Sequence, residues 1–113
     1  MARSGAPIGH LWPIFADERG EYELLSGDPA SERLNSIAQA GNDGYMLPEQ
    51  VWDNNPPSCT GAGCSFPQGE GTFSVTPLAW SHAQFVRLAW PIQAGRPAEQ
   101  PLIVACRYTR ACP

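Results

Sequence analysis

The feature that most constrains the fold is a long stretch without helical or strand periodicity, residues 53–75, which reads DNNPPSCTGAGCSFPQGEGTFSV. The 113-residue chain contains 11 glycines and 12 prolines, and they crowd its middle and its end. A structureless loop of this length is uncommon inside a compact domain and is usually functional or disordered. Because 42% of the residues are hydrophobic, enough for a core, we predict a functional loop within one loop-rich domain.

Capping signals and apolar periodicity predict two helices before this loop. The first is expected over residues 17–26, with Asp17 as its N-cap and Gly27 as its stop. The second is expected to start with the Asp-Pro pair at residues 28–29 and to end near Gly41.

A third and stronger helix is expected after the loop. Thr76 and Pro77 repeat the cap-then-proline signature and precede LAWSHAQFVRLAW. Pro91 is expected to kink or end this helix, because proline removes a backbone donor. The helix is apolar around much of its circumference, so it needs neighbours on more than one side. Its two apolar faces comprise Leu78, Phe85, Leu88, Ala89 and Ile92, and Trp80, Ala83, Arg87 and Trp90.

The C-terminal tail contains a short β-branched run, Leu102 to Ala105, which is expected to lie extended. The three helices each carry a broad apolar stripe, yet they do not close a core among themselves, and a chain of this size buries a limited share of its surface. We therefore expect an all-α piece of a larger helical domain, with about three helices and long loops.

Charge and hydropathy argue against several classes of function. The formal net charge is -4, and all 7 basic residues are arginine. An acidic chain without a basic stripe is a poor candidate for binding nucleic acid or a membrane surface. No apolar run is long enough to span a bilayer. Residues 1–10 lack the apolar core of a signal peptide, which leaves the compartment open.

The four cysteines, Cys59, Cys64, Cys106 and Cys112, do not have the C-x2-C spacing of zinc knuckles. Free thiols, or one loop disulfide between Cys59 and Cys64, are the favoured interpretations, and a four-thiolate metal site is the less favoured one. The sequence therefore predicts no metal and no other cofactor.

Glu49 lies in the segment GYMLPEQVWD, beside Pro48 and among apolar residues, with no basic residue nearby. A glutamate is rarely buried unless it is paired or put to use. From this segment alone, a solvent-facing Glu49 is the simpler interpretation. The alternative is that Pro48 restricts the backbone while apolar neighbours anchor it, so that the carboxylate faces a cavity. These anchors would be Tyr45, Met46, Leu47, Val51 and Trp52.

Four motifs favour the interpretation in which the Glu49 carboxylate faces a cavity. They are LWPIFADERGEYELLSG, NDGYMLPEQVWD, GEGTFSVTPLAWSHAQFVRLAW and GRPAEQPLIVACRY. Their order and spacing, from about Leu11 to Tyr108, resemble the C-terminal part of glycoside hydrolase family 15, the glucoamylases and glucodextranases. LPEQVWD and TPLAWSHAQFVRLAW are the most specific of these motifs. The resemblance implies an (α/α)6 barrel, of which residues 1–113 would supply the last helices and residues 53–75 a loop on the active-site side.

The resemblance also implies a reaction, since the family hydrolyses α-glucosidic bonds from non-reducing ends with inversion and releases β-glucose. Its substrate would be an α-glucan or an α-gluco-oligosaccharide. Inversion needs a general acid and a general base, and the resemblance assigns the base to Glu49. Gln50 would contact sugar hydroxyls or the nucleophilic water. Trp12 and Trp80 match positions near the sugar pocket, although core packing explains each tryptophan as well. His82 is expected to be a hydrogen-bonded structural residue.

The family's general acid would fall before Met1, and neither Glu70 nor Glu99 matches its motif. The chain alone is therefore expected to be inactive, with the missing N-terminal part of the same enzyme as its partner. Two other functions stay open: a non-catalytic carbohydrate-binding or interaction module, and a cysteine-stapled secreted domain. The sequence does not choose between α-1,4, α-1,6 and other linkages.

Overall fold

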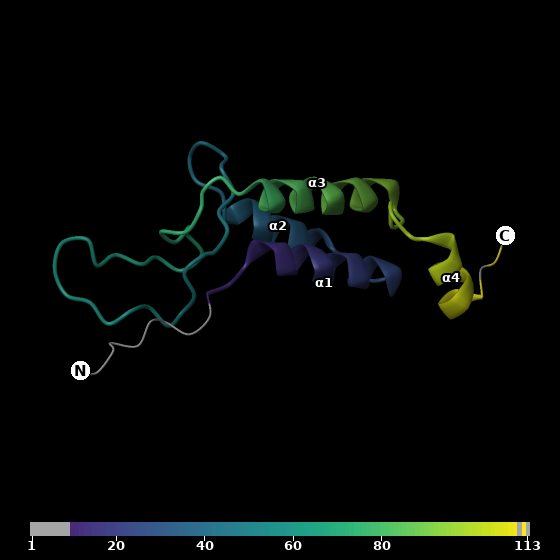
Figure 1. The fold of residues 1–113 in the computed structure, drawn as a ribbon, viewed down its shortest axis with the longest axis horizontal. Coiled ribbons are helices and arrows are strands. Elements are labelled where there is room, and N and C mark those ends of the chain that lie inside the picture. Colours follow the sequence, from purple (N-terminus) through teal and green to yellow (C-terminus); the bar gives the residue numbers. More distant parts are fainter. Residues whose placement is uncertain (1–9, 111, 113) are drawn as a thin grey trace.

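The computed structural model describes residues 10–110 and residue 112. Three helices lie side by side, the long loop extends from one end of this layer, and a fourth helix lies beyond the other end (Figure 1). In chain order the helices are α1 (Pro13–Leu25), α2 (Ser31–Gln39), α3 (Ala79–Ala94) and α4 (Leu102–Thr109).

Helix α1 begins earlier than its capping signal predicts. Pro13 occupies the first turn, where its missing N–H costs nothing, so the predicted cap at Asp17 is wrong. Asp17 instead lies inside the helix and is fully buried. The predicted stop at Gly27 is confirmed, because this glycine adopts a left-handed conformation with a φ of 83°.

Helices α2 and α3 begin later than predicted, and neither Asp28 nor Thr76 caps them. The residues that precede their first turns are Ala30 and Leu78, and neither makes a side-chain cap hydrogen bond. In α3 the start is set by a tertiary contact, since the N–H of Leu78 donates to the carbonyl of Leu47 at 2.9 Å.

Pro91 lies inside α3, so the expectation that it ends the helix is wrong, while the alternative expectation of a kink stays a prediction. The helix continues to Ala94, and the Pro91 side chain is almost fully buried. The helix ends at Gly95, where the N–H of Arg96 donates to the Pro91 carbonyl and the N–H of Gly95 donates to the Ile92 carbonyl. This pair of bonds is the Schellman motif, so Gly95 terminates α3.

The tail is also helical rather than extended. Helix α4 begins directly after Pro101, whose carbonyl accepts from the N–H groups of Val104 and Ala105. A lone extended run leaves its backbone groups without a partner strand, whereas a helix satisfies its own. Within the described chain, α4 does not contact α1, α2 or α3.

The core lies where α1, α2 and α3 meet. Leu88 of α3 is fully buried there, opposite Gly20 of α1. A Cβ at position 20 would lie 2.7 Å from Leu88 Cδ2 and 3.2 Å from the Cβ of Arg33. Gly20 therefore permits the close approach of the helices. The core side chains are Ala30, Ile37, Leu47 and Leu88.

Replacing Gly20 with valine is expected to destabilise the chain by about 1–2 kcal/mol, because the added methyl groups overpack the Leu88 contact. Urea unfolding measures the change, with Ala83→Val on the exposed side of α3 as the control. An unchanged midpoint for Gly20→Val would show that the helices are not in close contact there.

Much apolar surface remains uncovered in the described part of the chain. The radius of gyration is 17.5 Å, whereas a compact domain of this length has about 13 Å. The predicted first face of α3 packs inward, but the second face is exposed. There, Trp80 and Trp90 expose 53% and 67% of their surface. An open arrangement of this kind is what a part of a larger helical domain would show.

The cysteines form two disulfides, Cys59–Cys64 and Cys106–Cys112. The first matches the predicted loop disulfide, and the second replaces the predicted free thiols. In the described residues, no cluster of three or more histidine, cysteine, aspartate or glutamate side chains could hold a metal ion. None of the described helices is long and apolar enough to cross a membrane.

Candidate functional site

The backbone around Glu49 is irregular, as predicted, but it is closely hydrogen-bonded. The Glu49 N–H donates to the carbonyl of Val75 at 2.9 Å. The Gln50 N–H donates to Ser74 Oγ at 3.2 Å, and the Gln50 carbonyl accepts from the N–H of Thr72 at 2.9 Å. The end of the long loop therefore runs alongside the two predicted site residues and fixes their peptide groups.

The residues after Gln50 are held by a second set of contacts. The N–H of Val51 donates to the carbonyl of Leu11, and the Trp52 N–H donates to the carbonyl of Glu70, both at 2.9 Å. The buried Trp52 ring packs against Phe66 and Phe73, with centroid distances of 4.6 and 5.6 Å. An aromatic cluster thus joins the loop to the site segment.

The predicted anchors divide into two groups. Leu47, Val51 and Trp52 are buried, with at most 7% of their surface exposed, which confirms their anchoring role. Tyr45 and Met46 are exposed, so their predicted role as anchors is wrong. A turn directs them outward, because Asn42 Oδ1 accepts from the N–H groups of Gly44 and Met46, and Tyr45 has a left-handed φ of 59°.

The Glu49 side chain is half-buried, and its Oε1 accepts a hydrogen bond from Gln50 Nε2 at 2.8 Å. Among the described residues, no arginine forms an ion pair with the Glu49 carboxylate, so its charge is not neutralised. Such a carboxylate can accept a proton from a water molecule, which is the requirement for a general base. The structure thus brings Glu49 and Gln50 together.

The start of α3 reaches the residues before Glu49. Ser81 Oγ donates to the carbonyl of Pro48 at 2.7 Å, and His82 Nε2 accepts from the N–H of Leu47 at 2.9 Å. The expectation that His82 is hydrogen-bonded is confirmed. The sequence analysis missed Ser81 and Ser74, since nothing in their local sequence indicates a contact so distant along the chain.

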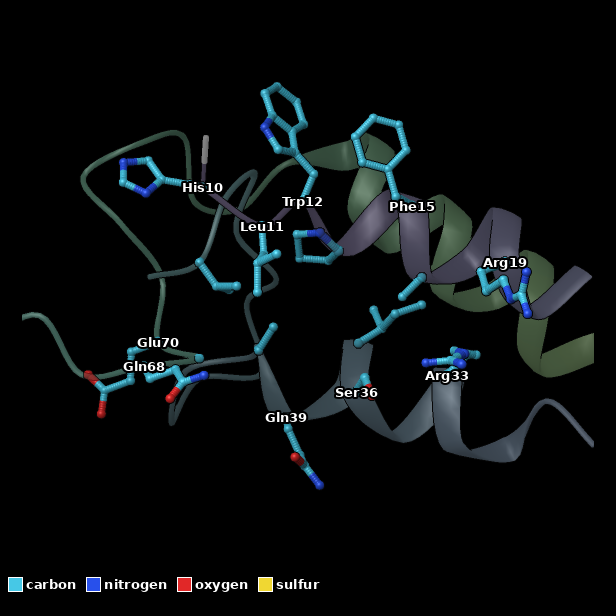
Figure 2. A pocket seen from close by; sticks show the side chains of 16 residues that line it. His10, Leu11, Trp12, Phe15, Arg19, Arg33, Ser36, Gln39, Gln68 and Glu70 are labelled. Carbon is cyan, nitrogen blue, oxygen red and sulfur yellow. The ribbon is translucent and has the colours of Figure 1, made fainter. Parts of the chain in front are cut away.

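Trp12 lines a hollow of about 650 Å³ between α1, α2 and the loop. In Figure 2, Trp12 and Phe15 lie on one rim, Arg19 and Arg33 lie toward one end, and Glu70 lies toward the other. Glu49 is not among the residues that line this hollow. Trp12 therefore lines a hollow to which the Glu49 side chain does not contribute.

Trp80 lies in the first turn of α3, next to Ser81, with its ring exposed. Its position excludes core packing within the described residues, which was the alternative interpretation. A role in binding sugar stays a prediction for Trp12, Trp80 and Gln50.

Asp17 is a second unusual carboxylate. It is fully buried, and neither of its oxygens has a hydrogen-bond partner among the described residues. Burial raises the pKa of Asp17 to about 7, repulsion from Glu21 and Glu18 adds to the rise, and Arg87 opposes it. Because Asp17 is inaccessible, it cannot protonate a leaving group in this arrangement.

Comparison with known proteins relates the chain to glucoamylases in sequence and in structure. No protein-family model matches the chain. In sequence, it is 34% identical over 104 residues to the glucoamylase of Clostridium sp. (strain G0005), a match that covers 92% of this chain and 13% of that protein. In structure, it resembles a bacterial glucoamylase in complex with acarbose, with a TM-score of 0.73 and 33% identity over 92% of this chain and 14% of that chain. The chain thus spans a small part of the length of these relatives.

Proposed function

We propose that this chain, which is a glucoamylase-like segment in sequence and in fold, supplies the general base of an inverting, exo-acting α-glucosidase. The described part is all-helical, as expected for a piece of an (α/α)6 barrel. The observation that carries the proposal is the Glu49 carboxylate, which forms no ion pair with an arginine of the described residues and accepts from Gln50. The peptide group that precedes it is hydrogen-bonded to Val75 and to Ser81.

A fixed carboxylate suits the role of a base in inversion. The base must hold a water molecule on the face of the sugar opposite the leaving group, so its position has to be constant. Gln50 donates to one carboxylate oxygen and leaves the other for this water. In the proposed reaction, Glu49 removes a proton from the water while the oxygen of that water attacks the anomeric carbon. The bond from this carbon to the glycosidic oxygen breaks, the general acid protonates the leaving oxygen, and β-glucose is released.

The general acid would come from the remainder of the barrel. Without a proton for the leaving oxygen, turnover loses a contribution of about 10²–10⁴-fold, so this chain alone would be inactive. The exposed face of α3, which carries Trp80 and Trp90, would contact helices of that remainder. The substrate would be an α-glucan or an α-gluco-oligosaccharide, consistent with the acarbose complex of the solved relative.

The test is assembly of an active enzyme. A bacterial glucoamylase from which the matching segment has been deleted is co-expressed with this chain, and the purified assembly is given maltose. We expect hydrolysis by the assembly but not by either part, with β-glucose as the first product in a proton NMR time course. Initial release of α-glucose would contradict inversion.

A binding measurement distinguishes the carbohydrate-binding alternative. A non-catalytic module would bind maltose without hydrolysing it, and Glu49→Gln would leave that binding unchanged. Isothermal titration of the chain with maltose, before and after the Glu49→Gln substitution, measures this directly.

A further inference from the structure

We propose that Ser81 and His82, in the first turns of α3, are positioning residues that set the direction of the Glu49 carboxylate. The inference rests on the proposed function of Glu49 and adds two residues to the site. Neither side chain needs to contact substrate, because each acts through the backbone that precedes Glu49.

The peptide group between Pro48 and Glu49 is held at both of its polar atoms. Its carbonyl oxygen accepts from Ser81 Oγ at 2.7 Å, and its N–H donates to the Val75 carbonyl at 2.9 Å. Proline has no N–H, so this carbonyl is the only hydrogen-bonding group of the Pro48 backbone. Ser81 is fully buried, which excludes water as a substitute donor from that side.

The preceding residue is held in the same way. The N–H of Leu47 donates to His82 Nε2 at 2.9 Å, and the carbonyl of Leu47 accepts from the N–H of Leu78. A ring nitrogen that accepts a hydrogen bond carries no proton, so the neutral His82 ring is protonated on Nδ1. The start of α3 therefore makes three hydrogen bonds to the two residues before Glu49.

These contacts fix the direction in which the Glu49 side chain leaves the backbone. Rotation of the Pro48–Glu49 peptide would swing the Cα–Cβ bond of Glu49 and displace its carboxylate. A displacement of about 1 Å at a reacting group can cost about 10²-fold in rate. Loss of the Ser81 or His82 contact should thus lower turnover more than it weakens substrate binding.

The experiment uses the enzyme assembled from this chain and the complementary glucoamylase helices. His82→Leu removes the acceptor, and Ser81→Ala removes the donor. Each is expected to lower kcat by about 10- to 10²-fold while KM changes by less than about 2-fold. His82→Gln places an amide oxygen near the position of Nε2 and is expected to restore kcat to within about 3-fold of the wild-type value. Gln93→Leu, at the exposed end of α3, serves as the control.

A spectroscopic measurement on the chain itself tests the hydrogen bond between His82 and Leu47 without catalysis. The ¹⁵N signal of His82 Nε2 is expected at the position of an unprotonated nitrogen, and the Leu47 amide is expected to exchange slowly with solvent. In His82→Leu, the Leu47 amide should exchange faster, and His82→Gln should slow it again. A protonated Nε2 in the wild-type chain at neutral pH would overturn the proposal.

The kinetic outcomes separate this inference from the proposed function. Unchanged kcat in Ser81→Ala and His82→Leu, with Glu49→Gln inactive, would overturn the positioning role and leave Glu49 as the base. Full activity in Glu49→Gln would overturn the proposed function and the positioning role together. This holds even where the ¹⁵N signal shows that His82 Nε2 still accepts the hydrogen bond from Leu47.

Discussion

Replacing Glu49 with glutamine is expected to lower kcat of the assembled enzyme by about 10²–10⁴-fold, the range that a general base contributes. Glutamine has nearly the same shape as glutamate, and the backbone bonds to Val75 and Ser81 do not involve the side chain. The variant should therefore assemble normally and bind maltose, yet it cannot accept a proton from the attacking water. The measurement is the rate of β-glucose release at saturating maltose.

Glu32→Gln is the matched control for this substitution. Glu32 is an exposed glutamate of α2, and its carbonyl, not its side chain, accepts a hydrogen bond from Ser36. We expect its kcat to stay within about 3-fold of the wild-type value, since a surface charge outside the reacting geometry contributes little. Equal losses in both variants would indicate a general effect of charge on assembly, and the base assignment would then fail.

Replacing Asp17 with alanine is expected to stabilise the chain at pH 8 but not at pH 4. The folded-state pKa of Asp17 is about 7, against 3.8 for the unperturbed group, because burial disfavours the charged form. Below pH 4 both the folded and unfolded states are protonated, so ionisation costs nothing. Between pH 4 and pH 7 the unfolded state binds fewer protons, so stability falls as the pH rises and stays low above pH 7.

At pH 8, Asp17→Ala is expected to raise the free energy of unfolding by about 1–3 kcal/mol. The pKa difference sets an upper bound of about 4 kcal/mol, and relaxation of the protein around the charged carboxylate lowers the free-energy cost of its burial below that bound. Urea unfolding at both pH values measures it. Asn35→Ala, on the exposed side of α2, corrects for the helix propensity of alanine and removes no charge that acts on Asp17. A gain of equal size at pH 4 and pH 8 would show that Asp17 does not ionise on unfolding.

The sequence predicted the existence of α1, α2 and α3 because their apolar residues recur at helical spacing. It did not predict where the helices start, because contacts from distant segments decide this. The start of α3 depends on the bond between Leu78 and Leu47, and a short capping motif at Thr76 carries no information about it. The β-branched tail was assigned wrongly because strand propensity has an effect only where a partner strand exists, and residues 102–105 have none in the described chain.

In the candidate site, too, neighbouring residues could be predicted from the sequence and contacts between distant segments could not. Pro48, Glu49 and Gln50 are adjacent in the sequence, so one motif sufficed to select them. Ser74 and Ser81 bond to this segment from far along the chain, and serine occurs in too many settings to be selected by type. The hollow that Trp12 lines was equally inaccessible to sequence reasoning, since it depends on how α1 and α2 pack together.

The hydrogen bonds that orient Glu49 all originate within the described chain, from residues 72–75 and from the first turns of α3. The backbone geometry of Glu49, the proposed base, thus depends on one contiguous stretch, residues 47–82. We therefore expect residues 47–82, transferred together into a related glucoamylase, to keep the hydrogen bonds that orient this glutamate.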